Sequence, residues 1–275
     1  MIPLIYILAL LITGALVGLV SGMLGVGGCF IMIPVQYWIL TAIGIEPTIA
    51  IRVAFGTNLL VVFPTALSGS FRHHKKKVIL WKQAIILGLT SMLFTFAGAY
   101  LATQLSSNIL KIIFGSAILL GALRMITARP IRIEGEPHAN AITYIFLGAI
   151  FGFITGLIGI GGGVLMIPLM VIFLNYHMHE AVGTSTAVMI FTSLGGAMAY
   201  ILYGLNAPGL PPYSVGYVNF LQWILLAGAS IPMAQLGVHF AHKINPKSLK
   251  WIFIIVMIYM GLKMIGVFSW LHLPI

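Results

Sequence analysis

Acidic side chains are nearly missing from this sequence. Aspartate does not occur, and four glutamates stand against 14 lysines and arginines, so the 275 residues carry a formal charge of +10 at pH 7. Apolar residues make up 60% of the chain and charged residues only 7%. A soluble domain of this size could not bury so much apolar surface, whereas a lipid bilayer accepts it. The composition therefore predicts an integral membrane protein.

Other absences narrow the function. A single cysteine, Cys29, excludes a disulfide within the chain. The sequence has no G-x-x-x-x-G-K-[ST] motif, which excludes ATP hydrolysis by a P-loop. It also lacks the zinc-protease motif, a nucleophile elbow and any carboxylate pair within the apolar segments, so we expect neither enzymatic activity nor a cofactor. His73 and His74 have no cysteine or carboxylate nearby, so we expect no metal site.

The positive charge has a membrane explanation. On a soluble protein it would suggest nucleic acid as a partner. Here the basic residues gather in short loops between apolar segments, which is typical of cytoplasmic membrane loops. We therefore expect the lipid bilayer, and not nucleic acid, as a partner of this chain.

Eight apolar segments approach or exceed the roughly 20 residues that cross the hydrocarbon core. The first has neither a basic leader before it nor a cleavage-type boundary after it, which favours a retained helix over a signal peptide. The segments are residues 3–24, 48–69, 78–104, 107–127, 140–158, 180–203, 218–241 and 250–271.

A glycine-rich string, G-A-x-x-G-x-x-x-G-x-x-G-x-G-G, occurs at residues 14–28 and again at 148–162, each time followed by Met-Ile-Pro. Further blocks repeat in the same order. They are 54–58 with 181–185, 110–114 with 249–253, and 123–126 with 262–265. Four matching blocks indicate an internal duplication. We divide the chain into an N-terminal repeat (1–128), a polar linker (129–138) and a C-terminal repeat (139–275).

Loop charge predicts that the two repeats are inverted. Residues 72–77 are basic while their counterpart 204–217 is uncharged, and the weakly charged turn 105–108 corresponds to the basic stretch 241–247. Because basic loops face the cytoplasm, the charge bias changes sides between the repeats. The predicted cytoplasmic loops are 70–77, 128–139 and 242–250.

Inversion requires an odd number of crossings in each half. Residues 29–43 and 162–176 are short segments of about 15 residues, which reach only about 22 Å of a 30 Å core. The predicted fold is an all-α polytopic membrane protein. It has two inverted repeats of about five helical elements each, and the first two elements of each repeat meet at an unwound Gly-x-Gly-Gly loop. A re-entrant hairpin plus three full spans per half is equally compatible with the sequence.

The two Gly-x-Gly-Gly breaks are the strongest candidates for a binding site. Lipid offers no partner for free backbone groups, so such breaks survive only inside protein or beside a polar cavity, and paired breaks in two halves are typical of transporters. A helix that starts after a break presents free N–H groups and a partial positive charge, which suits an anion. The residues are Gly25, Gly27, Gly28, Gly159, Gly161 and Gly162. The earlier glycines of each string instead fit close helix packing.

Polar residues at matching positions of the two halves could add donors. Thr57 and Asn58 in the first half correspond to Thr184 and Ser185 in the second. Their side chains could bind an oxyanion, or could bond their own backbone or a neighbouring helix. Arg52 could clamp an oxyanion with its guanidinium, or could extend to the membrane interface.

The doubled Gly-x-x-Gly-x-Gly-Gly…Pro blocks, each followed by a Gly-Thr-[Asn/Ser] helix, resemble the sulfite exporter TauE/SafE family over essentially the whole chain. This resemblance implies movement of sulfite, sulfoacetate or other small sulfur-containing anions across the cytoplasmic membrane, generally outward. The motif carries over at the break glycines, at Pro34 and Pro168, and at the Gly-Thr pairs. The halves differ in having Cys29 where the second has Gly163, and Asn58 opposite Ser185.

The predicted function is secondary transport of a small sulfur-containing oxyanion, as an exporter, by alternating access around paired glycine loops at the membrane midplane. The expected partners are this anion and the bilayer, and the sequence leaves a homodimer open. Two alternatives remain. One is a membrane subunit that acts with a separate ATPase or sulfur-handling partner, and the other is an intramembrane enzyme.

Overall fold

The computed structural model describes residues 4–24, 29–127, 140–162, 166–167, 170–171, 174, 176–240 and 246–270. Helices dominate these ranges, and one short antiparallel β-hairpin joins α8 to α9. The elements are α1 (Leu4–Leu24), α2 (Cys29–Ala42), α3 (Pro47–Lys75), α4 (Trp81–Gln104), α5 (Ser107–Thr127), α6 (Ala141–Ile158), α8 (Met178–Gly204), β1 (Ser214–Val215), β2 (Val218–Asn219), α9 (Phe220–Phe240), α10 (Pro246–Ile265) and α11 (Val267–Trp270).

Five of the described helices, α3, α4, α5, α6 and α8, are long and apolar enough to cross a membrane. Large apolar side chains also cover the outside of the bundle. Leu93 on α4 is 71% exposed and Ile142 on α6 is 78% exposed. Lipid accepts such surfaces, whereas water does not favour them over so wide an area. The structure is that of an all-α polytopic membrane protein, as the sequence predicts.

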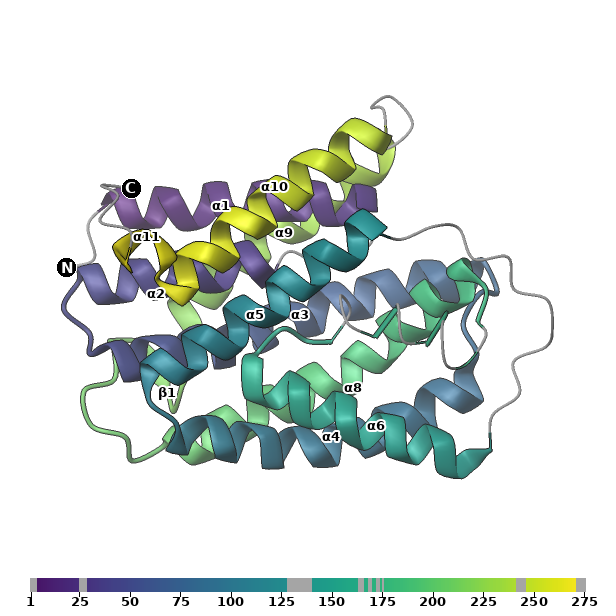
Figure 1. The fold of residues 1–275 in the computed structure, drawn as a ribbon, viewed down its shortest axis with the longest axis horizontal. Helices are drawn as coiled ribbons and strands as arrows, with labels where there is room; N and C mark the ends of the chain where they lie inside the picture. Colours follow the sequence, from purple (N-terminus) through teal and green to yellow (C-terminus); the bar gives the residue numbers. More distant parts are fainter. Residues whose placement is uncertain are drawn as a thin grey trace.

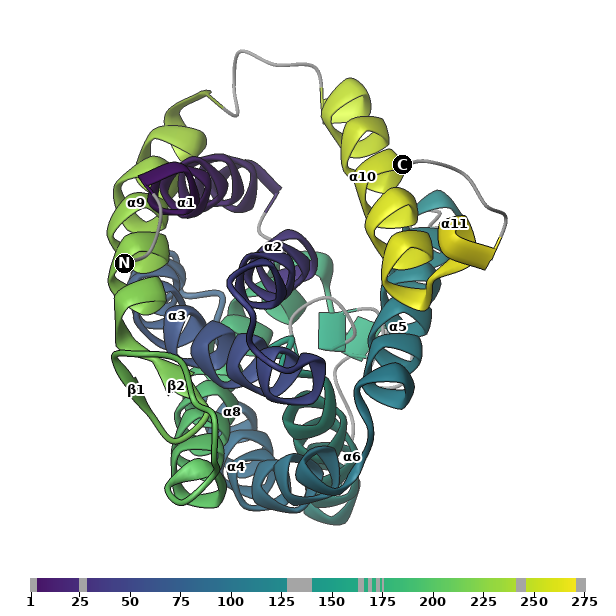
Figure 2. The same ribbon diagram turned by 90° about the vertical axis from the view of Figure 1, so that its left-hand side faces the viewer.

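The helices form a bundle in which α2 and α3 lie at the centre (Figures 1 and 2). Around them, α1 packs on α9, α5 packs on α10, and α4 packs on both α6 and α8. Figure 2 shows these groups on three sides of α2 and α3. The first helix of each half therefore packs on a helix of the other half.

Glycines allow helices of the two halves to pack closely on each other. A Cβ added at Gly18 of α1 would overlap the carbonyl oxygen of Ser230 on α9, and one added at Gly152 of α6 would overlap that of Ser91 on α4. The same holds one turn earlier, for Gly14 against Leu226 and for Gly148 against Leu87. The early glycines of the repeated string thus serve close helix packing, in equivalent pairs.

Two equivalent hydrogen bonds show where helices begin. The hydroxyl of Thr57 on α3 accepts the backbone N–H of Asn219 at 2.8 Å, just before α9. The hydroxyl of Thr184 on α8 accepts the backbone N–H of Leu80 at 3.1 Å, just before α4. Each bond joins one half of the chain to the other: α9 begins beside Thr57 of α3, and α4 begins beside Thr184 of α8. Further contacts, Trp223 with Leu60 and Gly195 with Met92, make α3 parallel to α9 and α8 parallel to α4.

The element at the start of each half doubles back, and we call these elements the two hairpins: α1 with α2, and α6 with the segment that leads to α8. The order of the glycine contacts makes α1 parallel to α9 and α6 parallel to α4. Hence α1 and α3 begin at one end of the molecule, and α6 and α8 begin at the other. The chain therefore turns back between α1 and α3, and again between α6 and α8. The two hairpins therefore enter the bundle from opposite ends. Helices α3, α4 and α5 follow the first, and α8, α9, α10 and the short α11 follow the second.

Candidate functional site

The second glycine break, residues 159–162, interrupts the helix in a conformation that glycine permits. Gly159 has φ +67°, Gly161 has φ +76° and Gly162 has φ +96°. L-residues with a side chain adopt such values only with strain. Gly159 is the C-cap of α6. Its N–H makes the last helical bond, to the carbonyl of Thr155 at 2.9 Å, and its positive φ ends the helix. The sequence pattern therefore marks a real break in the helix.

Side chains from two other helices satisfy the carbonyls of this break. The Asn58 side chain on α3 donates from Nδ2 to the carbonyl of Gly159 at 2.7 Å. The Thr192 hydroxyl on α8 donates to the carbonyl of Gly161 at 3.2 Å. Because lipid cannot replace these partners, the break is stable only inside the bundle. The second glycine break is thus held by one helix from each half.

Asn58 also reaches the first hairpin. Its side chain is fully buried, and the Cys29 thiol lies beside its amide. Cys29 is the first residue of α2 and follows directly on residues 25–28. Gly25, Gly27 and Gly28 themselves lie outside the described residues, so their role in the site stays a prediction. What the structure does show is that α2 begins beside the same asparagine that binds the second break.

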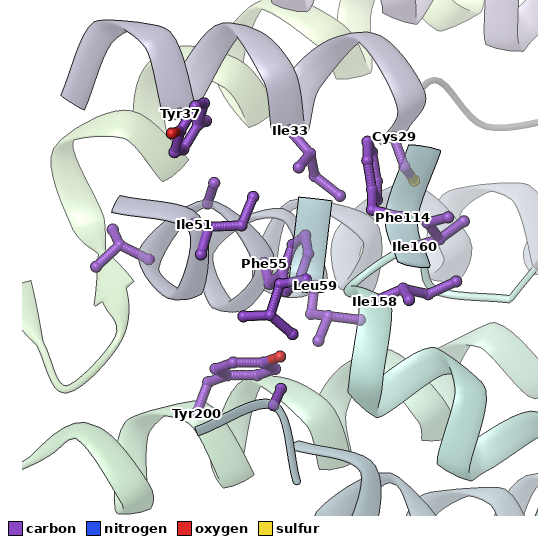
Figure 3. Close-up of a cluster of buried hydrophobic side chains, with 14 of the residues drawn as sticks. Cys29, Ile33, Tyr37, Ile51, Phe55, Leu59, Phe114, Ile158, Ile160 and Tyr200 are labelled. Carbon is purple, nitrogen blue, oxygen red and sulfur yellow. The ribbon is translucent and has the colours of Figure 1, made fainter. Parts of the chain in front are cut away.

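Figure 3 shows the surroundings of this meeting point. Cys29 from α2, Phe114 from α5 and Ile160 from the second break lie close together, and Phe55 of α3 packs beside them. All four side chains are buried in one apolar cluster. Within it, the Oδ1 atom of Asn58 has no hydrogen-bond partner among the residues that the structure describes. A buried polar atom without a partner is unfavourable, and this oxygen marks a place where a hydrogen-bond donor such as water would be stabilised.

Little space surrounds the second break in this arrangement. A cavity of about 10 Å³ lies against Gly162, Thr155 and Ile160. That volume is about the size of one water molecule. A Cβ added at Gly161 would lie 3.0 Å from Val62, near the middle of α3. The second break is therefore closed against α3, and a larger solute can enter only if the two separate.

The two predicted threonines bond backbone N–H groups at the starts of α9 and α4, and not the second break. Thr57 and Thr184 are both fully buried, and their hydroxyls accept the cross-half N–H bonds described above. Ser185, the counterpart of Asn58, donates to the carbonyl of Val182 on its own helix at 3.0 Å. Of the four predicted polar ligands, the structure brings only Asn58 to the second break.

Arg52 lies six residues before Asn58 on α3, about 9 Å along the helix axis. Its guanidinium donates to the Tyr217 hydroxyl at 3.3 Å and to the Leu105 carbonyl at 3.2 Å. It thereby connects α3 to the β-hairpin and to the turn between α4 and α5. Arg52 is partly buried and does not contact the second break.

Sequence reasoning missed Thr192, although the repeat contained a signal for it. Thr65 occupies the position in α3 that Thr192 occupies in α8, in the same register as Thr57 and Thr184. Its hydroxyl bonds the carbonyls of Val61 and Val62 on its own helix. A threonine at the same position of both repeats was thus the signal in the sequence that indicated Thr192.

Comparison with known proteins agrees with the architecture. The family profile described as "Sulfite exporter TauE/SafE" matches residues 10–264. A "Probable membrane transporter protein MJ0441" of Methanocaldococcus jannaschii is 33% identical over 93% of this chain and 94% of its own length. The "Probable membrane transporter protein YunE" of Bacillus subtilis is 28% identical over 94% and 98%, respectively. A search of solved structures gave no significant match.

The matches run through both hairpins and all the helices that hold the second break. The profile covers nearly the whole chain, and the relatives align with it almost from end to end. Their printed names describe transporters. The chain therefore belongs to the sulfite exporter TauE/SafE family of membrane proteins.

Proposed function

We propose that this protein is a secondary transporter that exports a small sulfur-containing oxyanion, such as sulfite or an organosulfonate, through a site formed at the two glycine breaks. The family description supports the substrate class. The carrying observation is that Asn58 lies beside the start of α2 and binds the second break, so that both hairpins meet at one buried amide.

The chemistry at this point suits an anion. Helix α2 begins there, and the first N–H groups of a helix lack intrahelical acceptors and carry a partial positive charge. Among the described residues, the carboxylates belong to Glu46 and Glu180, which lie at the starts of α3 and α8, away from the breaks. An oxyanion between the hairpins would therefore meet the first N–H groups of α2 and no carboxylate of the described residues.

The inverted hairpins supply a route for alternating access. Each hairpin enters from a different end, so movement of one hairpin away from α3 opens the site to one side only. In the closed arrangement described above, the contact of Gly161 with Val62 and the Asn58–Gly159 bond hold the second hairpin against α3. Exchange of these contacts for contacts with a bound anion would couple binding to opening.

We further propose that the protein lies in the cytoplasmic membrane with loops 70–77, 128–139 and 242–250 on the cytoplasmic side. The end of α3 carries Arg72, His73, His74 and Lys75 in its last turn. Basic residues at this end of the bundle favour its cytoplasmic placement. The β-hairpin and the end of α10 then face outward.

The test is flux of radiolabelled sulfite from proteoliposomes that contain the full chain. Gly27→Leu and Gly161→Leu should each abolish flux, because a side chain at a break fills the site and blocks the backbone. Gly228→Leu is the matched control, since nothing lies within 4 Å of a Cβ at Gly228. Gly161→Ala, a smaller change, should reduce flux while the protein stays folded. Unchanged flux in both Gly27→Leu and Gly161→Leu would overturn the site.

A further inference from the structure

A larger cavity lies apart from the glycine breaks, between α2, α5, α10 and α11. Its volume is about 210 Å³. Its lining includes Tyr37 and Trp38 from α2, Lys111 from α5, and Lys263 from α10. Sites for drug-sized ligands occupy roughly 300–1,000 Å³, so this cavity suits a smaller molecule.

The two lysines face aromatic rings in place of carboxylates. The ammonium of Lys111 lies 5.5 Å from the ring centre of Tyr37, and that of Lys263 lies 4.8 Å from the ring centre of Trp38. Lys263 also donates to the Tyr259 hydroxyl at 3.1 Å. None of the residues that line the cavity in the described part of the chain is acidic. Both positive charges are therefore available to a soluble anion.

The position of the cavity connects it to the proposed site. Lys111 lies near the start of α5 and Lys263 near the end of α10, at the end of the molecule that also holds the β-hairpin (Figure 1). Tyr37 lies eight residues after Cys29 on α2, which is about 12 Å along the helix. One short helix thus carries the aromatic wall of the cavity at one end and begins beside Asn58 at the other.

The repeat places basic residues at equivalent positions of the same two helices. Lys111 and Arg124 of α5 correspond to Lys250 and Lys263 of α10. Since α5 and α10 run in opposite directions, Lys111 lies near Lys263, and Arg124 shares its end with Lys250. A transporter with inverted halves would need an anion-attracting entrance at each end, and this arrangement fits that need.

We infer that the cavity between Lys111 and Lys263 is a binding site for a small oxyanion with a short apolar tail, as in an organosulfonate, and that it forms the outward vestibule of the transport path. This inference rests on the proposed function. The ammonium groups bind the oxyanion by charge-assisted hydrogen bonds. The rings of Tyr37 and Trp38, with Met264 and Phe268, provide the apolar wall against which the tail packs.

Fluorescence of Trp38 gives a test that needs no transport. The tryptophan fluorescence of the full chain in detergent is quenched with iodide, an anion, and separately with neutral acrylamide, at constant ionic strength. Subtracting the fluorescence of the Trp38→Phe variant isolates the signal of Trp38. Methanesulfonate should protect Trp38 from iodide along a saturating curve, and sulfate should protect it more weakly. Acrylamide quenching should be similar in all variants and reports that the fold is retained.

Removal of the charges should weaken protection strongly. Lys111→Gln and Lys263→Gln should each raise the methanesulfonate concentration for half-protection by roughly tenfold, as expected for loss of a charge-assisted hydrogen bond. Lys263→Arg should restore most of the effect. Lys82→Gln is the matched control, because it removes the same charge from an exposed position at the opposite end.

The outcomes separate this inference from the proposed function. Protection that does not saturate, or an equal loss in Lys82→Gln, would overturn the vestibule site. Saturating protection that persists in Gly161→Leu while flux is lost supports both proposals. If flux is unchanged in Gly27→Leu and Gly161→Leu but Trp38 protection depends on the two lysines, the glycine site is wrong and the vestibule stands.

Discussion

At the scale of single residues, Asn58 has the most consequential position in the chain. Its Nδ2 atom binds the Gly159 carbonyl, while its Oδ1 atom has no partner within the described ranges. The donor half of the amide is therefore structural, and the acceptor half is open to a hydrogen-bond donor such as water. Ser185, at the equivalent position of the second half, bonds its own helix. The two halves thus differ at this position, because only Asn58 bonds the second break.

Asn58→Leu should lower both stability and flux. The Gly159 carbonyl would lose its buried partner, and leaving such a group unsatisfied lowers the free energy of unfolding by about 1–3 kcal/mol. Thermal unfolding in detergent and sulfite flux would measure the two effects. Asn108→Leu, at an exposed position on α5, is the control and should change neither. Normal flux in a folded Asn58→Leu protein would remove Asn58 from the proposed site.

Thr57→Val and Thr184→Val should behave as an equivalent pair. Each removes a buried acceptor of a cross-half N–H bond, so each should destabilise the protein by about 1–3 kcal/mol with little change in the KM for sulfite. Parallel unfolding and flux measurements on both variants check this. A raised KM at unchanged stability would instead assign these hydroxyls to the substrate.

At the scale of elements, the sequence predicted the helices, the duplication and the second break, because composition and glycine spacing report directly on them. It did not predict that α1 packs on α9 and α6 on α4, since those contacts join residues more than 50 positions apart, such as Gly152 and Ser91. The sequence left open that Thr57 and Thr184 bond a neighbouring helix, but it could not name Asn219 and Leu80 as the partners, for the same reason. Lys111 and Lys263 came together only through the folding of α5 against α10.

The glycine contacts between elements can be tested by single methyl groups. Gly18→Ala and Gly152→Ala should each destabilise the protein by about 1–3 kcal/mol or more, because the added Cβ overlaps backbone of the facing helix. Gly228 lies on α9, the helix against which α1 packs. Gly228→Ala should be neutral or stabilising, because the added Cβ meets open space and alanine lowers the entropy of the unfolded chain. Thermal unfolding of the three variants in one detergent compares them. Equal effects at all three positions would contradict the packing.

At the scale of the whole molecule, the two hairpins enter from opposite ends and meet beside one asparagine. In the proposed mechanism, the closed cavity at the second break and the open, cationic cavity near Lys263 lie on one transport path. The cavity near Lys263 has a volume of about 210 Å³, and the cavity at the second break one of about 10 Å³. In this proposal, a solute held near Lys263 can reach the second break only if a hairpin moves, and alternating access requires such a movement.

The inverted arrangement makes a prediction about which surfaces face which side of the membrane. In a Cys29→Ala background, a cysteine in place of Lys76 should react with a membrane-impermeant maleimide only from the cytoplasmic side. A cysteine in place of Tyr213, which is 71% exposed beside the β-hairpin, should react only from outside. Labelling of intact cells and of inverted vesicles measures the two, and the Cys29→Ala protein without added cysteine gives the background. Because α3 and α8 run between these two positions in opposite directions, reaction of both cysteines from one side would contradict the proposed topology and, with it, the idea that each hairpin opens to its own side.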